Sequence, residues 1–70
     1  MDSFRLVFDK LHAAGLPDAN ARERIYAECR AEVQAAYTAK DERDRALIEL
    51  DKVIRRQEMQ ALHEESLHGQ

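Results

Sequence analysis

The sequence predicts an all-α protein in which a short N-terminal helix folds on a helical hairpin. Gly and Pro total three of the 70 residues, and Ala numbers eleven whereas Thr, Val and Ile together number seven. Alanine favours helices and β-branched residues favour strands, so this composition favours helix over sheet. In addition, apolar residues recur every three or four positions in three segments of the chain, which is the spacing of one helix face.

The first predicted helix covers about residues 3–14. Its apolar residues have the spacing i, i+3, i+4 and i+7 of a single helix face: Phe4, Val7, Phe8 and Leu11. Asp2 or Ser3 can cap its start by accepting hydrogen bonds from free backbone N–H groups. Gly15 suits the left-handed position that commonly follows a helix. We expect this face, with both phenylalanines and Leu11, to lie in the hydrophobic core.

The second predicted helix covers about residues 18–38. It follows the clearest break in the chain, where Pro17 disfavours helix at the residue before it and Asp18 can cap the new helix. Its apolar stripe has 3–4 spacing, with one flanking residue: Tyr26, Cys29, Val33, Ala36 and Tyr37, flanked by Ile25. We expect Ile25 and Val33 to contribute to the core.

The third predicted helix covers about residues 41–65 and contains the strongest apolar run of the chain. Four of its residues are expected to form an interface with another chain: Leu47, Leu50, Val53 and Ile54. The polar residues 63–70 are expected to fray, as chain ends commonly do. Together, residues 1–70 are expected to form one small helical domain.

The stretch between the second and third helices leaves two arrangements open. Residues 38–45 contain no apolar side chain larger than alanine, and cap-like residue pairs favour a hairpin with its turn near 38–41. In the alternative, a short helix precedes one long helix that pairs as a dimeric coiled coil, because 3–4 spacing continues unbroken over 26–61. Lys40 and Arg43 then occupy seam positions that a coiled coil prefers to be apolar. The hairpin is therefore the favoured prediction.

The small size of the chain favours association with another protein surface. In a chain of 70 residues, the free energy of burying apolar surface nearly cancels the entropy lost on folding. Cys29 is the single cysteine, so no internal disulfide can add stability. We therefore expect a homo-oligomer, most simply a dimer, or a protein that docks on a larger one.

The residues that could carry chemistry do not form a convincing site. Cys29 lies on an apolar stripe, where a thiol is usually buried and inert. Histidine and glutamate side chains gather near the C-terminal end, where we expect them to be solvated: His63, Glu64, Glu65 and His68. No catalytic, cofactor-binding or metal-binding residue is predicted. The expected function is that of a non-enzymatic helical protein–protein interaction module, such as an adaptor, assembly factor or regulator.

Charge and hydropathy indicate where such a protein acts. The net charge of −3 does not favour nucleic-acid binding. No apolar run approaches the roughly 18 residues of a membrane span, and the segment Met1–Phe4 lacks the basic start of a secretory signal. We expect a soluble, cytoplasmic protein that does not bind membranes.

A DNA-binding regulator is the alternative function. The first two predicted helices, over residues 4–26, are joined by a short glycine-containing turn, as in helix-turn-helix units. Asn20, Arg22 and Arg24 would project from the start of the second helix, where arginine can contact guanine and asparagine can contact adenine. The acidic Glu23 interrupts this basic face and weakens the hypothesis.

Overall fold

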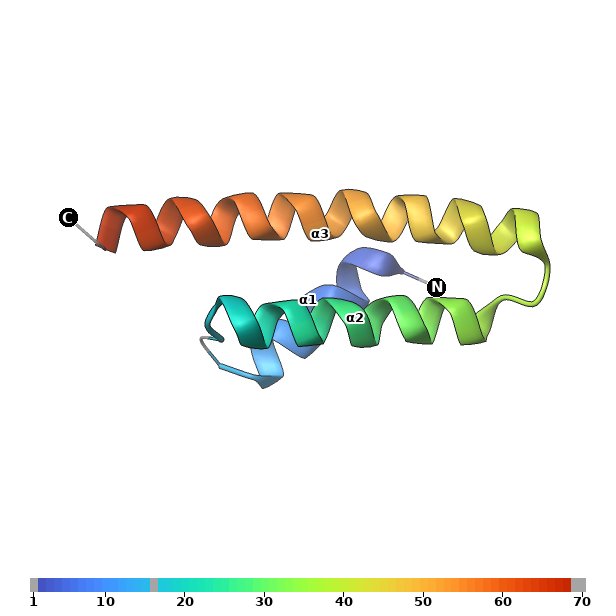
Figure 1. The fold of residues 1–70 in the computed structure, drawn as a ribbon, viewed down its shortest axis with the longest axis horizontal. Coiled ribbons are helices and arrows are strands. Elements are labelled where there is room, and N and C mark those ends of the chain that lie inside the picture. Colours follow the sequence, from blue (N-terminus) through green and yellow to red (C-terminus); the bar gives the residue numbers. More distant parts are fainter. Residues whose placement is uncertain (1, 16, 69–70) are drawn as a thin grey trace.

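Three helices follow one another along the described part of the chain, and the last two form an antiparallel pair (Figure 1). The computed structural model describes residues 2–15 and 17–68. Its helices are α1 (Ser3–Ala13), α2 (Ala19–Ala36) and α3 (Lys40–His68). All regular secondary structure in these residues is helical, so the all-α prediction is confirmed. The hairpin is confirmed as well, and the alternative of one long helix is wrong.

The turn of the hairpin lies at residues 37–39, close to its predicted place. Tyr37 adopts an extended conformation (φ −120°, ψ 121°) and ends α2. The backbone N–H of Arg43 then donates to the carbonyl oxygen of Ala39 at 2.9 Å, which starts α3. This reversal lets the apolar stripes of α2 and α3 bury each other, whereas a continuous helix would leave both exposed.

The ends of α1 and the start of α2 use the residues that the sequence predicts. Asp2 Oδ1 accepts a hydrogen bond from the backbone N–H of Arg5 at 3.2 Å, and Asp18 Oδ1 accepts one from Ala21 at 2.8 Å. Gly15 has a φ of +82°, a left-handed conformation that glycine adopts without a steric penalty. These local signals place α2 so that it runs back along α1.

The core lies where the three helices meet. Its buried apolar residues, among those described, are Val7, Tyr26, Cys29, Val33, Leu50 and Ile54. Val33 is thus a core residue as predicted, and Leu11 and Ile25 are partly buried against the core. Leu50 and Ile54 were expected at an interface between chains, and this prediction is wrong because the hairpin buries them inside the same chain. Leu47 and Val53 are partly buried beside them.

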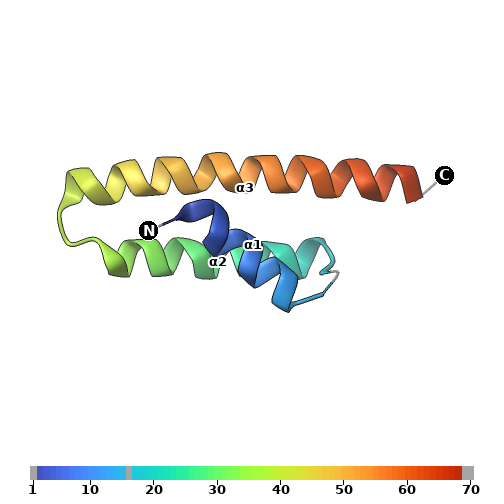
Figure 2. The ribbon, with the colours of Figure 1, turned by 180° about the vertical axis from the view of Figure 1, so that it is seen from behind.

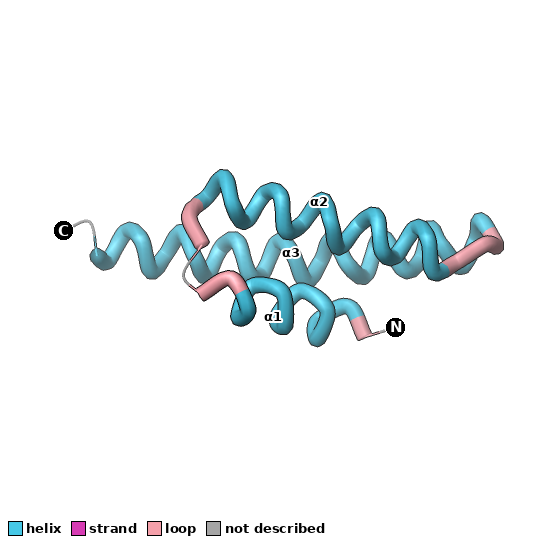
Figure 3. The backbone as a smooth tube through the Cα atoms, turned by 90° about the horizontal axis from the view of Figure 1, so that it is seen from below, coloured by secondary structure: helices cyan, strands magenta, loops and turns pink. Residues whose placement is uncertain are grey.

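The prediction that Phe4 and Phe8 anchor the core is wrong. Their exposed fractions are 54% and 47%, whereas Val7 is fully buried. Helix α1 packs against both α2 and α3 (Figures 2 and 3). Lys10 forms ion pairs across to α2, with its Nζ 3.7 Å from Glu28 and 3.1 Å from Glu32. Phe8 lies about 100° around the helix from Val7. Because Val7 faces the core, both phenyl rings lie on the side of α1 that is exposed to solvent.

The last helix is longer than the sequence predicts. It contains 29 residues and continues through His68, so the frayed tail expected at 63–70 is helical as far as it is described, and residues 69–70 lie outside the described part. Figure 1 shows its C-terminal end extending beyond the start of α2. Glu65, in this terminal part, forms an ion pair with Arg22 of α2. This contact holds the end of α3 against the rest of the protein.

Candidate functional site

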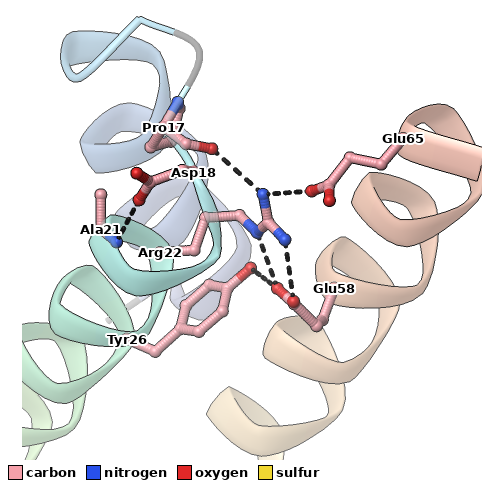
Figure 4. Close-up of polar contacts among 7 residues, drawn as sticks. All are labelled: Pro17, Asp18, Ala21, Arg22, Tyr26, Glu58 and Glu65. Carbon is pink, nitrogen blue, oxygen red and sulfur yellow. Dashed lines mark hydrogen bonds and ion pairs between the residues drawn. The ribbon is translucent and has the colours of Figure 1, made fainter. Parts of the chain in front are cut away.

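A buried arginine is the centre of the most extensive polar cluster among the described residues (Figure 4). The guanidinium of Arg22 donates to both carboxylate oxygens of Glu58, from Nε at 3.0 Å and from Nη2 at 3.1 Å. Its Nη1 donates to the carbonyl oxygen of Pro17 at 3.1 Å and lies 2.6 Å from Glu65 Oε1. The hydroxyl of Tyr26 donates to Glu58 Oε2 at 2.9 Å. These residues are called the Arg22 cluster below.

The Arg22 cluster stabilises its own charges. Hydrogen bonding to Glu58 raises the pKa of Arg22 above its already high value, and the same contact holds the pKa of Glu58 below its usual range. Burial, followed by the hydrogen bond to Glu58, raises the pKa of Tyr26 to about 12. Arg22 and Glu58 are therefore charged and Tyr26 is neutral near pH 7. All of these groups are engaged with one another, and none is poised to transfer a proton.

The geometry of the cluster gives it a structural role. Arg22 joins the connection before α2 to two points on α3 that are seven residues apart, Glu58 and Glu65. A shift of α3 by one turn would move both carboxylates by about 5.4 Å and break the bidentate contact. Bidentate arginine–carboxylate pairs are directional as well as strong. The cluster therefore fixes the register of α2 against α3.

This arrangement corrects the DNA-contacting role predicted for Arg22. Its side chain is only 6% exposed and points toward α3, so it cannot contact base edges. Asn20 and Arg24 are exposed on α2, as the hypothesis required. A helix-turn-helix protein presents several side chains of one helix to the DNA together. Here Arg22, the middle of the three predicted residues, is instead buried in an ion pair.

The sequence contained a signal for the cluster that the sequence analysis did not use. Arg22 and Tyr26 continue, at 3–4 spacing, the same stripe as Cys29 and Val33. Arg22, on the extension of this stripe, is buried as Tyr26 is, and buried charges require partners. Glu58 supplies that partner from α3.

Acidification is expected to destabilise the fold through Glu58. Its pKa is lowered in the folded protein from its ordinary value of 4.5. Its contribution to stability is therefore complete above that value and is lost as the pH falls through the lower pKa of the folded state. Urea unfolding at about pH 7 and about pH 3 should show a smaller loss of stability in Glu58→Gln than in the unmodified protein. Glu23→Gln, which alters an exposed carboxylate of α2, is the control and should lose as much stability on acidification as the unmodified protein. If Glu58→Gln also lost as much stability as the unmodified protein, Glu58 would not be the group responsible for the acid sensitivity.

One exposed apolar surface lies on α1. The rings of Phe4 and Phe8 stack with centroids 5.9 Å apart, and those of Phe8 and His12 stack at 5.6 Å. The three rings form an aromatic ladder along the outer side of the helix. Aromatic side chains are enriched at protein interfaces because they bury a large area with few rotatable bonds.

A second exposed apolar surface lies on the face of α3 opposite Leu50. Ile48, Met59 and Leu62 are 56%, 66% and 54% exposed. With two cations between them they form a stripe with alternating spacings of four and three residues: Ile48, Lys52, Arg55, Met59 and Leu62. This is the spacing of a helix–helix seam. The set is called the α3 outer stripe below.

Two of the groups considered for chemistry, Cys29 and Glu65, lie in the core and in the Arg22 cluster. Cys29 is fully buried, and its burial raises the pKa of its thiol, which lowers its reactivity as a nucleophile. Glu65 is engaged by Arg22. Within residues 2–15 and 17–68, no cluster of three or more His, Cys, Asp or Glu side chains is arranged to hold a metal ion.

The described part of the chain is thus a three-helix bundle with a buried ion-pair cluster and two exposed apolar surfaces. No protein-family model, curated protein or solved structure matches the chain. Of the helices described, none combines the length and the hydrophobicity needed to cross a lipid bilayer.

Proposed function

We propose that this protein is a non-enzymatic helical protein–protein interaction module, an adaptor, assembly factor or regulator that self-associates or docks on a larger protein. The observation that carries the proposal is the placement of large apolar side chains on the outer faces of α1 and α3, where none of the described helices covers them. Single exposed apolar residues are common on protein surfaces. Organised groups of them mark sites of association.

Two further features support the proposal. The core is small, so covering an outer face with a second protein surface would add stability to a domain of this size. The Arg22 cluster holds α2 and α3 in a fixed register, and a rigid helix face is a suitable recognition surface because little entropy is lost when it binds. A cytoplasmic location, in which Cys29 stays reduced, belongs to the same proposal.

Site-specific photo-crosslinking in the producing cell tests this function. A benzoylphenylalanine residue placed at Phe8 or at Met59 should give adducts of discrete mass, because both positions lie on exposed apolar surfaces. An adduct of twice 8.1 kDa indicates self-association, and a heavier one indicates a larger partner. Sedimentation of the purified protein over about a hundredfold dilution would independently reveal self-association by a falling mass.

The control places the same crosslinker at Glu23, an exposed polar position of α2. That variant should give no discrete adduct. If neither Phe8 nor Met59 gives more adduct than Glu23, and the mass stays at 8.1 kDa at every concentration, the interaction module is the wrong function.

A further inference from the structure

The α3 outer stripe combines apolar ends with a basic centre. Ile48 lies near one end, Met59 and Leu62 lie toward the other, and Lys52 and Arg55 lie between them. From Ile48 to Leu62 the stripe spans about 21 Å at about 1.5 Å per residue. A second helix lying along it would meet apolar side chains at both ends and cations in the middle.

Glu49 pairs with Lys52, whereas no carboxylate of the described residues forms an ion pair with Arg55 or the adjacent Arg56. Asp51 accepts a hydrogen bond from Arg30 of α2 at 3.2 Å, and Glu49 lies 3.4 Å from Lys52. Arg55 and the adjacent Arg56 are exposed and form no ion pair within the described residues. Two guanidinium groups are therefore available to carboxylates from outside the chain.

These charges disfavour a second copy of the chain as the occupant. If two copies pair antiparallel so that Ile48 meets Leu62 of the other copy, Arg55 lies opposite its own counterpart. If they pair parallel and in register, every residue faces itself, and Arg55 again meets Arg55. Like charges that face each other across a helix seam are destabilising.

We propose that the α3 outer stripe binds an acidic amphipathic helix of a partner protein. Apolar residues of that helix would pack on Ile48, Met59 and Leu62, and its carboxylates would pair with Arg55 and Arg56. Arginine suits this role because its planar guanidinium binds carboxylates with two parallel hydrogen bonds. The inference rests on the proposed interaction function and adds the chemistry of the partner.

The size of the stripe predicts the strength of binding. Contact along about 21 Å of a single helix face is smaller than a standard interface of about 1,600 Å². The complex should therefore be transient, with a dissociation constant in the micromolar range of about 1–100 μM. Because the contact includes exposed ion pairs, its affinity should decrease as salt is added.

Fluorescence anisotropy with designed peptides tests the inference on the full chain. The probe is a labelled helical peptide about three heptads long, with leucine at the seam positions and glutamate on both flanks. A matched peptide carries lysine in place of every glutamate. The acidic peptide should bind at least about tenfold more tightly than the basic one. The double variant Arg55→Glu with Arg56→Glu should reverse this preference, and circular dichroism should show that it retains the helicity of the unmodified protein.

Arg24→Glu is the control, because it reverses an exposed cation on α2 away from the stripe; it should leave the affinity for the acidic peptide unchanged. Equal binding of both peptides, no binding of either, or undiminished binding by the double variant would overturn the inference. Binding to vesicles of phosphatidylserine and phosphatidylcholine without binding to the acidic peptide would overturn the inference in favour of a membrane. A dimer that is abolished by Met59→Lys would overturn it in favour of a second copy of the chain. If crosslinking at Phe8 or Met59 succeeds while the acidic peptide fails to bind, the interaction function stands and this partner chemistry is wrong.

Discussion

Leu50→Ala is expected to unfold a large fraction of the protein molecules. Leu50 is fully buried in α3, at the centre of the core formed with Val33 and Ile54. Replacing a buried leucine by alanine costs about 2–5 kcal/mol, because the transfer free energy of the side chain is lost and a cavity remains. A domain of this length has a total stability of only about 3–10 kcal/mol. Urea unfolding monitored by circular dichroism should show the loss.

Ile48→Ala is the matched control for this experiment. It removes a similar aliphatic side chain from the same helix two residues earlier, at an exposed position. Its effect on the free energy of unfolding should stay within about 0.5 kcal/mol. The loss in Leu50→Ala should also be independent of protein concentration, since Leu50 packs within its own chain; a loss that disappears at high concentration would mean that Leu50 lies at an interface.

Arg22→Met should produce the second large effect. Methionine keeps an unbranched side chain of comparable length but removes the guanidinium that binds Glu58, Glu65 and the Pro17 carbonyl. Removing one partner of a buried ion pair costs about 3–5 kcal/mol, since the other charge loses its compensation. The side chains of Glu58 and Glu65 are 32% and 53% exposed, so water replaces part of the lost interaction. We expect a loss of about 3 kcal/mol, at the low end of that range.

A double-mutant cycle with Glu58→Gln distinguishes this pairing from a general loss of packing. The combined variant Arg22→Met with Glu58→Gln should be less destabilised than the sum of the two single variants, because no unpaired carboxylate remains. Arg24→Met, at an exposed position of the same helix, should change the free energy of unfolding by less than about 0.5 kcal/mol. Additive effects of Arg22→Met and Glu58→Gln would show that the two side chains do not interact.

Local features of the sequence were sufficient to predict the three helices, the limits of α1 and the start of α2, but not the end of α3. Asp2 and Asp18 cap the two helices predicted for them, and Gly15 adopts the left-handed conformation expected after α1. These interactions involve residues within about four positions of each other, so they depend little on the rest of the fold. The hairpin was also predictable, because two apolar stripes separated by a polar segment bury each other best when the chain reverses.

The sequence did not determine which side of each stripe faces the core. In α1 the apolar face includes Val7 and Phe8. Only packing against α2 and α3, with the ion pairs of Lys10 to α2, buries Val7 and leaves Phe8 exposed. Leu50 was assigned to an interface with another chain, whereas it lies in the core of its own chain. Periodicity identifies an apolar face but not the surface that covers it.

The partner of Arg22 was likewise decided only by the tertiary structure. Arg22 and Arg24 both lie at the start of α2, but Arg22 lies on the extension of the apolar stripe and is buried, whereas Arg24 is exposed. The difference comes from Glu58, 36 positions away in the sequence, which the hairpin brings to within 3.0 Å. The start and end of α1 and the start of α2 follow from short-range hydrogen bonds that the sequence encodes directly. The rotation of each helix about its axis and the pairing of buried charges follow from contacts that exist only after the helices have packed. A buried charge has lost its contact with water and is stable only beside a partner of opposite charge.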